Sequence, residues 1–327
     1  MNDNDQSVDT GRRLYYSSSQ GPFYNANNIF MFYGGGNRGC IVESVNAALR
    51  NRQPIIHVHG EAGSGKTMLS LVVSDRVKER YHTIRYDLPE ISSAKLLRHL
   101  LIELAPQHSD LISAEQAQNG ASDRSIKNAL LCIEEQLGKV RHLTHNKPYL
   151  LFVDSKAALD AEALQVIERL SGFRVDHEPI MHCVVFHTAD SNAERYAAVS
   201  DTPYQSENHF WLRRLTLAEI NEYLRHHMML FDFNRRDLFT REMAYFIADR
   251  SEGVFKSINT LARNAFTIAN LEEADKLSMS HLLMAGLPVP KEPDTHSSFA
   301  VRHRFATVAL MGFGALSAIA FVLYLVG

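Results

Sequence analysis

Short apolar runs alternate along the greater part of this chain with segments in which apolar residues recur every three or four positions. The short runs fit strands that are buried on both faces, and the wider spacing fits helices with one buried side. Strands separated by helices predict an α/β fold in which a parallel sheet is covered by helices on both faces. The expected strands are 54–59, 83–87, 149–154, 181–186 and 210–212. The expected helices are 41–50 and 126–137, together with a helix that begins near residue 68 and a helix capped by Ser92 or Ser93.

Beyond residue 214 the pattern becomes entirely helical. Thr216-Leu217-Ala218-Glu219 has the form of a capping box that begins a helix, and the stretches 239–248 and 258–269 keep the helical spacing. Residues 1–28 are polar and rich in turn formers, so no structure is assigned to them. We therefore expect five parts: an N-terminal segment and helix (1–53), an α/β core (54–214), a small helical lid (215–286), a proline-rich linker (287–304) and an apolar terminal segment (305–327).

A glycine-rich motif stands between the first expected strand and the helix that follows it. The residues read GEAGSGKT and match G-x-x-x-x-G-K-[ST] at every fixed position. The glycines let the backbone curl so that amide groups point at phosphates beside the positive end of the helix. The motif predicts an ATP site with Mg²⁺, and a chance glycine-rich turn is the alternative. Its expected residues are Gly60, Glu61, Ala62, Gly63, Ser64, Gly65, Lys66, which would contact the β- and γ-phosphates, and Thr67, which would bind the metal.

Asp154 is the second candidate for the catalytic chemistry, beside Lys66. It ends an apolar strand that follows the motif, as expected for the carboxylate that helps to hold Mg²⁺, although many strands end in aspartate because of a turn. The next position, where many such ATPases have glutamate, is Ser155. A hydroxyl does not accept a proton as a carboxylate does, so hydrolysis is slow, uses another acid or does not occur.

An aromatic run, Ile29-Phe30-Met31-Phe32-Tyr33, precedes the first expected helix. In many proteins with this motif the segment ahead of the first strand helps to cover the adenine base. Packing of these side chains into the core is the alternative.

The far end of the chain is apolar. Residues 305–327 contain no charged side chain over about 23 residues, or roughly 35 Å of helix, which is enough to cross a bilayer. We therefore expect a C-terminal transmembrane helix here, and a buried helix of the globular part is the alternative. Arg302, His303 and Arg304 precede this stretch, and the positive-inside rule assigns their side to the cytoplasm. The chain begins with acidic and polar residues rather than a signal peptide.

Composition narrows the choice of partners. A net charge of −3 disfavours a general nucleic-acid-binding surface. The three cysteines, Cys40, Cys132 and Cys183, are scattered and fit a reducing compartment. The sixteen histidines, including His226 and His227, show no metal-ligand spacing, so surface or capping roles are expected.

Four segments together carry a resemblance to a known family. GEAGSGKT, LLFVDSKAAL, FWLRRLTLAEINEYLRHHM and SEGVFKSIN resemble the AAA+ ATPases of the general secretion pathway protein A (ExeA-like) group, which is related to pilus-assembly and DamX-associated ATPases. The resemblance covers about residues 21–285 and implies a P-loop AAA+ fold. It also implies a single-pass protein of the bacterial inner membrane with a cytoplasmic N-terminal domain, homo-oligomers, and partners in the envelope or bound to peptidoglycan.

The family pattern also implies roles for residues outside the glycine-rich motif. Relatives carry an arginine that faces the nucleotide in the lid, and the matching residue here is Lys256, which keeps the charge but loses the planar fork. His187 or Thr188 matches a polar sensor position, with a strand-end role as the alternative. The candidates for an arginine that completes a neighbouring subunit's site are Arg195, Arg213 and Arg214.

Three functional hypotheses follow. The first is a membrane-anchored ATPase that assembles or remodels a secretion, pilus or cell-division complex. The second is an ATP-binding scaffold with little or no turnover, motivated by Ser155 and Lys256. The third, an ATP-dependent DNA-handling protein, rests on the wider use of this ATPase class on DNA.

Overall fold

The computed structural model describes residues 22–24, 28–87, 92–141, 147–154, 160–175, 177–188, 208–231 and 238–286. The chain divides into two compact units, residues 1–286 and 287–327, and every described residue belongs to the first. In the ranges given above, no helix combines the length and the apolar character needed to cross a bilayer. The proline-rich linker and the apolar stretch at 305–327 lie outside these ranges, so the membrane span stays a prediction.

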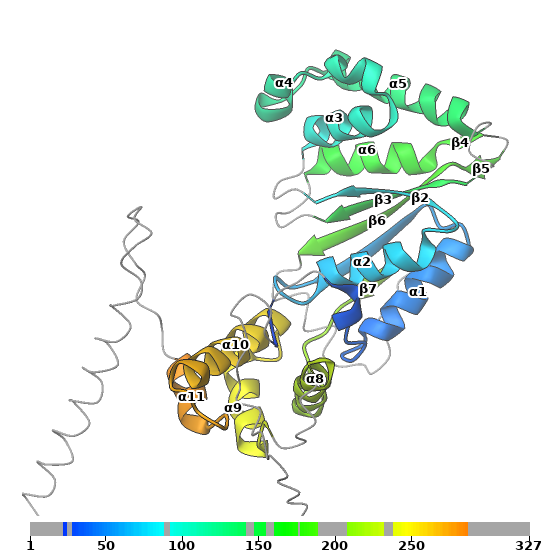
Figure 1. Cartoon of the computed structure of the whole chain (residues 1–327). Coiled ribbons are helices and arrows are strands. Elements are labelled where there is room, and N and C mark those ends of the chain that lie inside the picture. Colours follow the sequence, from blue (N-terminus) through cyan, green and yellow to red (C-terminus); the bar gives the residue numbers. More distant parts are fainter. Residues whose placement is uncertain are drawn as a thin grey trace, which may run out of the picture. The chain divides into compact units, whose positions relative to one another are not determined.

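A five-stranded parallel sheet forms the centre of the described unit (Figure 1). The strand order is β2-β3-β6-β1-β7, and every neighbouring pair is parallel. The α/β prediction is therefore confirmed. The strands are β1 (Ile55–Gly60), β2 (His82–Tyr86), β3 (Tyr149–Asp154), β6 (Met181–Thr188) and β7 (His209–Trp211), and a separate two-stranded hairpin is formed by β4 (Arg174–Val175) and β5 (Glu178–Pro179).

Alternation along β3 shows why the sheet is covered on both faces. Leu150 and Phe152 pack into one buried cluster, Leu151 and Val153 pack into another, and none of the four is exposed. Successive side chains of a strand point to opposite faces, so a continuous apolar run needs cover on both. One face carries α1 (Arg38–Arg50) and α2 (Lys66–Val77), and the other carries α3 (Ser93–Leu104), the 3-10 helix η2 (Pro106–Leu111), α4 (Ala114–Asn119), α5 (Asp123–Arg141) and α6 (Ala161–Gly172).

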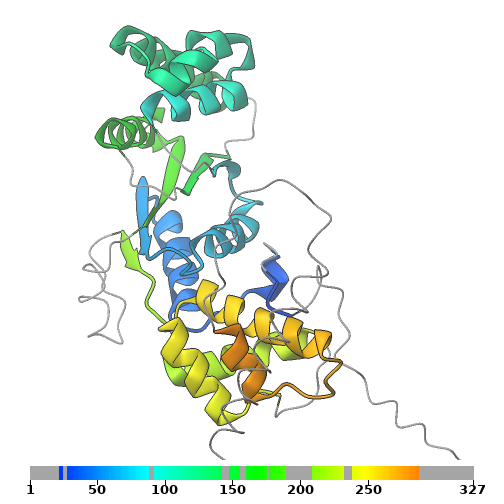
Figure 2. The ribbon, with the colours of Figure 1, turned by 90° about the vertical axis from the view of Figure 1, so that its left-hand side faces the viewer.

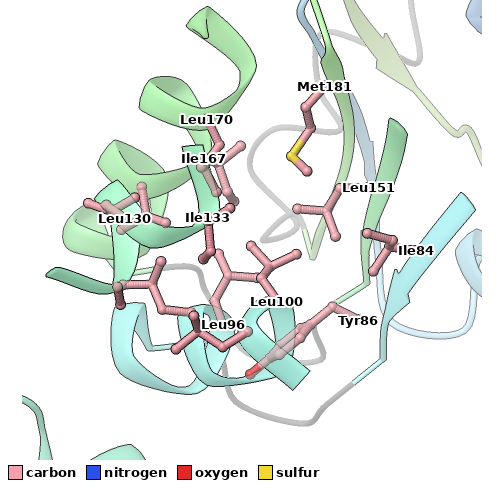
Figure 3. Close-up of a cluster of buried hydrophobic side chains, with 14 of the residues drawn as sticks. Ile84, Tyr86, Leu96, Leu100, Leu130, Ile133, Leu151, Ile167, Leu170 and Met181 are labelled. Atoms are coloured by element: carbon pink, nitrogen blue, oxygen red, sulfur yellow. The ribbon is translucent and has the colours of Figure 1, made fainter. Parts of the chain in front are cut away.

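The helices α3, α5 and α6 pack on their face of the sheet through aliphatic side chains. Figure 3 shows Leu96 and Leu100 of α3 facing Leu151 of β3, with Ile133 and Ile167 from the two neighbouring helices beside them. Ser92 begins α3 by accepting a hydrogen bond from the Lys95 backbone N–H, which decides between the two expected caps. The helices α4 and α6 were not predicted.

The lid consists of α8 (Leu217–Leu230), α9 (Arg241–Ser251), α10 (Phe255–Leu271) and α11 (Met279–Ala285). Figure 2 shows these helices grouped together, coloured yellow-green to orange. Thr216 and Glu219 form the predicted capping box at the start of α8. Phe23, from the segment ahead of the core, is fully buried in the lid cluster and stacks on His227 and Phe266, so this segment helps to build the lid.

Replacing Leu100 by alanine should destabilise the protein, because Leu100 is fully buried in the cluster of Figure 3 and truncation leaves a cavity. The expected loss of unfolding free energy is about 2–5 kcal/mol. Ile102→Ala is the matched control, since Ile102 lies on the same helix but is 47% exposed. Denaturant unfolding of the full chain measures both, and equal losses would contradict this packing.

Candidate functional site

The glycine-rich loop leaves β1 at Gly60 and enters α2 at Lys66, as the motif predicts. Gly63 and Gly65 have φ values of +85° and +97°, in the left-handed region that favours glycine. A Cβ atom on Gly63 would also lie 2.6 Å from the Cβ of Lys256, and the Lys256 backbone N–H donates to the Gly63 carbonyl at 3.2 Å. The lid thus contacts the loop directly, and Lys256 lies where the family resemblance expects a cation.

The Lys66 side chain folds back over the loop and is held there by two hydrogen bonds. Its Nζ donates to the carbonyls of Gly60 and Glu61 at 2.8 and 2.9 Å, and the residue is only 7% exposed. Burial lowers the pKa of the Lys66 ammonium, while the charges of Asp154 and Glu61 oppose this shift. A buried cation whose acceptors are neutral carbonyls fits a role in binding an anion.

Thr67 and Asp154, the two predicted metal ligands, meet at the carboxyl ends of the strands. Thr67 Oγ1 donates a hydrogen bond to Asp154 Oδ2 at 2.6 Å. Hydroxyl and carboxylate oxygens are the ligands that Mg²⁺ prefers in proteins, where it keeps several waters and phosphate oxygens as further ligands. The pair therefore fits the metal role that the sequence assigns to it.

A cavity of about 510 Å³ opens beside the loop. This volume lies in the range of small-molecule and cofactor sites. The cavity lining includes the loop residues 62–67, Asp154 and Thr188, together with aromatic residues of the N-terminal segment and the lid. The aromatic residues of the lining are Tyr24, Phe32, Tyr33, Tyr223 and Phe255.

Phe32 and Tyr33 show the core packing that was one of the two alternatives for the aromatic run, and both also border the cavity. Phe32 packs against the sheet cluster and Tyr33 against the lid cluster. The Tyr33 hydroxyl donates to the Glu219 carbonyl at 3.2 Å, which holds the ring against α8. The rings form an apolar wall next to the loop, and contact of this wall with an adenine base stays a prediction.

Arg38 is a site residue that the sequence analysis missed. It lines the cavity, is 2% exposed, and donates from its guanidinium to the backbone carbonyls of Gly36, Ser64 and Arg213. Burial, followed by the charge of Arg213, lowers the pKa of Arg38 to about 9. No sequence signal marked Arg38, because its partners are main-chain oxygens, one from the neighbouring Gly36 and two from the distant residues Ser64 and Arg213.

The remaining predicted residues divide between the cavity and other roles. Of the two candidates for the sensor position, Thr188 lines the cavity and His187 does not, and the sensor role stays a prediction. Arg213 forms an ion pair with Glu219 at 2.6 Å, and Arg214 forms ion pairs with Glu61 and Glu252. Ser155 and Arg195 lie outside the described residues.

Four histidines gather on one face of the sheet beside the loop, contrary to the expected surface or capping roles. His57 and His59 alternate on β1, so both side chains share a face with His187 and His209 of the flanking strands. His57 Nδ1 lies 2.8 Å from His187 Nε2, and His59 Nε2 lies 2.9 Å from His209 Nδ1. Among the residues that the structure describes, no group of three or more His, Cys, Asp or Glu side chains could hold a metal ion.

His227 also departs from its expected surface role. It is 4% exposed, stacks on Phe23 and lines the cavity. Burial lowers its pKa to about 4, with a smaller effect from His226. His227 is therefore part of the apolar wall.

In this structure the first strand of a parallel sheet leads through the glycine-rich loop into a helix, and Thr67 contacts Asp154 at the strand ends. This arrangement defines the P-loop class. No protein-family model and no curated protein matches this chain.

Solved structures share the fold. Cdc6p from Pyrobaculum aerophilum has a TM-score of 0.56 at 13% identity, over 79% of this chain and 70% of that chain. The Aeropyrum pernix ORC2 protein, solved as ADPNP–ADP complexes, has a TM-score of 0.50 at 15% identity, over 77% and 67%. The Aeropyrum pernix ORC1 protein, solved with DNA, has a TM-score of 0.52 at 14% identity, over 77% of this chain and 64% of that chain, so this chain spans less than two thirds of it. The chain has the AAA+ fold, and membership of the general secretion pathway protein A group stays a prediction.

The histidine group predicts a pH dependence of stability. Burial lowers the pKa of His57, His59 and His187 to about 4, 3 and 4, and the neighbouring histidines add to each shift. Below the unfolded pKa of about 6.5 the unfolded chain binds protons that the folded chain rejects, so stability falls as pH falls. From pH 6.5 to 5, above the range in which carboxylates titrate, each histidine contributes a slope of at most about 1.4 kcal/mol per pH unit.

Unfolding free energies of the full chain at pH 7, 6 and 5 measure this slope. His57→Gln should make it shallower, and the control His108→Gln, at an exposed histidine, should leave it unchanged. A stability that stays flat or rises as pH falls from 6.5 to 5 would show that these rings are not held neutral.

Proposed function

We propose that this chain is a membrane-anchored AAA+ ATPase that binds ATP with Mg²⁺, hydrolyses it and uses the cycle to assemble or remodel a bacterial envelope complex. The observation that carries the nucleotide chemistry is the 2.6 Å hydrogen bond from Thr67 Oγ1 to Asp154 Oδ2. It joins the loop to the end of β3, and the 510 Å³ cavity with its polar and aromatic lining opens there.

Four residues of the cavity lining, Lys66, Thr67, Asp154 and Lys256, have roles in this proposal. Lys66 exchanges its two carbonyl acceptors for phosphate oxygens, since both present partners belong to the loop backbone. Thr67 and Asp154 hold the metal, and bound Mg²⁺ neutralises charge that develops on the β- and γ-phosphates. Lys256 adds a cation from the lid, with one ammonium in place of the fork of an arginine.

A second candidate, an ATP-binding scaffold with little turnover, is favoured by the same two departures from the family pattern. Ser155 stands where a glutamate would activate the attacking water, and Lys256 stands where relatives have arginine. Neither change weakens the loop, which supplies the binding. The two candidates therefore predict the same affinity for ATP and differ in phosphate release.

The envelope role rests on the sequence. The uncharged stretch at 305–327 and the basic residues Arg302 and Arg304 support a single-pass anchor in the inner membrane with the ATPase on the cytoplasmic side. We further propose that the active form is a homo-oligomer, since AAA+ sites are usually completed by an arginine of a neighbouring subunit. Arg213 and Arg214 remain candidates for this role, although each also has an ion-pair partner in its own chain.

Lys66→Ala should weaken Mg-ATP binding by about tenfold or more, because it removes the charged donors to the phosphates. Asp154→Asn should keep binding within a few-fold and lower turnover by about 10² or more, because charge stabilisation acts chiefly in the transition state. Calorimetry and phosphate release on the full chain in detergent measure the two quantities. Lys78→Ala, which removes an exposed lysine paired with Asp75, is the control and should change neither.

The outcomes separate the candidates. Turnover that Asp154→Asn abolishes supports the enzyme, and tight binding without phosphate release supports the scaffold. An absence of Mg-ATP binding, or an affinity that Lys66→Ala leaves unchanged, would rule out both.

Deleting residues 305–327 should release the chain from membranes. The apolar stretch is the only part that we propose to insert, so the full chain should stay in the membrane pellet after an alkaline carbonate wash and the deletion variant should not. Protease added to inside-out vesicles should digest the ATPase domain. A full chain that remains in the supernatant would contradict the anchor without affecting the nucleotide site.

A further inference from the structure

A second cavity, of about 520 Å³, lies at the end of the sheet opposite to the ATP site. We call it the basal cavity. The ATP site lies at the carboxyl ends of β1 and β3, whereas the basal cavity is lined by the residues that lead into β3 and β6 and by the chain that follows α1 and α2. The two cavities share no lining residue.

The basal cavity is strongly cationic. Arg50, Arg52, Arg80 and Lys147 line it, and Glu178 is the one carboxylate of its lining. Four cations and one carboxylate leave an excess of three positive charges, in a chain whose net charge is −3. The cations come from three separate segments, so their approach is a property of the fold. Like charges brought together repel each other, and a bound anion relieves that repulsion.

Arg52 occupies a backbone position that favours glycine. Its φ is +57°, in the left-handed region, at the turn that ends α1, where glycine is the common residue. Holding a non-glycine side chain there strains the backbone. The only ion pair of Arg52 among the described residues is with Glu178, and both side chains are largely exposed, so this pair stabilises the fold little. This ion pair and the turn therefore favour an arginine at 52 only weakly, and an anion in the cavity would give its guanidinium a further partner.

The floor of the basal cavity is buried and its polar atoms are held by the backbone. Tyr81 donates its hydroxyl to the Leu49 carbonyl at 3.0 Å, and His182 Nδ1 lies 2.7 Å from the Gln53 carbonyl and donates to it. The two rings pack edge to face with centroids 5.6 Å apart. Neither ring of the floor carries a negative charge that would neutralise the rim cations, and the Arg80 Cζ lies over the Tyr81 ring, 5.8 Å from its centroid.

We propose that the basal cavity binds a ligand that carries adjacent phosphate groups. Guanidinium groups hold phosphate oxygens through two parallel hydrogen bonds, and two or more cations around one cavity match the charge of adjoining phosphates. A cavity of this volume accommodates a group of nucleotide size. The phosphates come either from a free polyphosphate compound or from the backbone of a nucleic acid, and this proposal stands independently of the ATPase activity.

The test uses the full chain in detergent with Lys66→Ala as background, so that the glycine-rich loop does not capture the probe. Tripolyphosphate is titrated by calorimetry, and a short single-stranded oligonucleotide by fluorescence anisotropy. Arg52→Gly and Arg80→Gln should each weaken binding of the preferred probe by about tenfold. Arg76→Gln is the control, since it removes an exposed arginine of α2 that lines neither cavity.

Arg52→Gly separates loss of binding from loss of folding. Because glycine suits the backbone at this position, its melting temperature should equal or exceed that of the parent. If tripolyphosphate binds and both Arg52→Gly and Arg80→Gln weaken its binding, the ligand is a free polyphosphate compound. If only the oligonucleotide binds and both variants weaken its binding, the ligand is the backbone of a nucleic acid. Binding of neither probe, or equal effects of Arg76→Gln and Arg52→Gly, would overturn the proposal.

Discussion

The hydrogen bond from Thr67 to Asp154 depends on the order of the strands more than on any local preference. The two residues are 87 positions apart, and in the sheet β6 lies between β1, which leads into the loop before Thr67, and β3, which ends at Asp154. Because all the strands are parallel, their carboxyl ends meet at one edge, where the register aligns Gly60 with Thr188 and Asp154 with Phe186. A strand order or direction that moved β3 away would leave the loop without its carboxylate. The buried clusters on the two faces of the sheet therefore support the site as well as the fold.

The apolar strands and the glycine-rich loop could be predicted from the sequence because both signals are local. A run such as Tyr149-Leu150-Leu151-Phe152-Val153-Asp154 fits few structures other than a strand covered on both faces, and β3 has these bounds. The loop requires glycine where φ is positive, so its residue types reveal its shape. Ser92 and Thr216 likewise act at the helix starts where capping chemistry places them.

The remainder depends on contacts between distant segments. Arg38 enters the site through three main-chain carbonyls, which no pattern of side chains reveals. His57 and His59 form a group with His187 and His209 only when β1 lies between β6 and β7, so each looks like an isolated histidine in the sequence. The helix α4 spans only six residues, too few to show a helical spacing. The helix α6 was missed although Asp160 caps it and Ala163, Val166, Ile167 and Leu170 recur at the helical spacing, so its signal was present in the sequence.

The loop and the lid are joined by charged and backbone contacts that act on the same few residues. Arg214, between β7 and α8, binds Glu61 of the loop through two nitrogens and Glu252 of the lid through a third. The Lys256 backbone N–H adds a hydrogen bond to the Gly63 carbonyl. A change in the shape of the loop must alter these contacts. The conformational equilibria of the loop and the lid are therefore coupled. The carbonyl of Ser64 is also bound by Arg38, which extends the same coupling to the N-terminal segment and its aromatic wall.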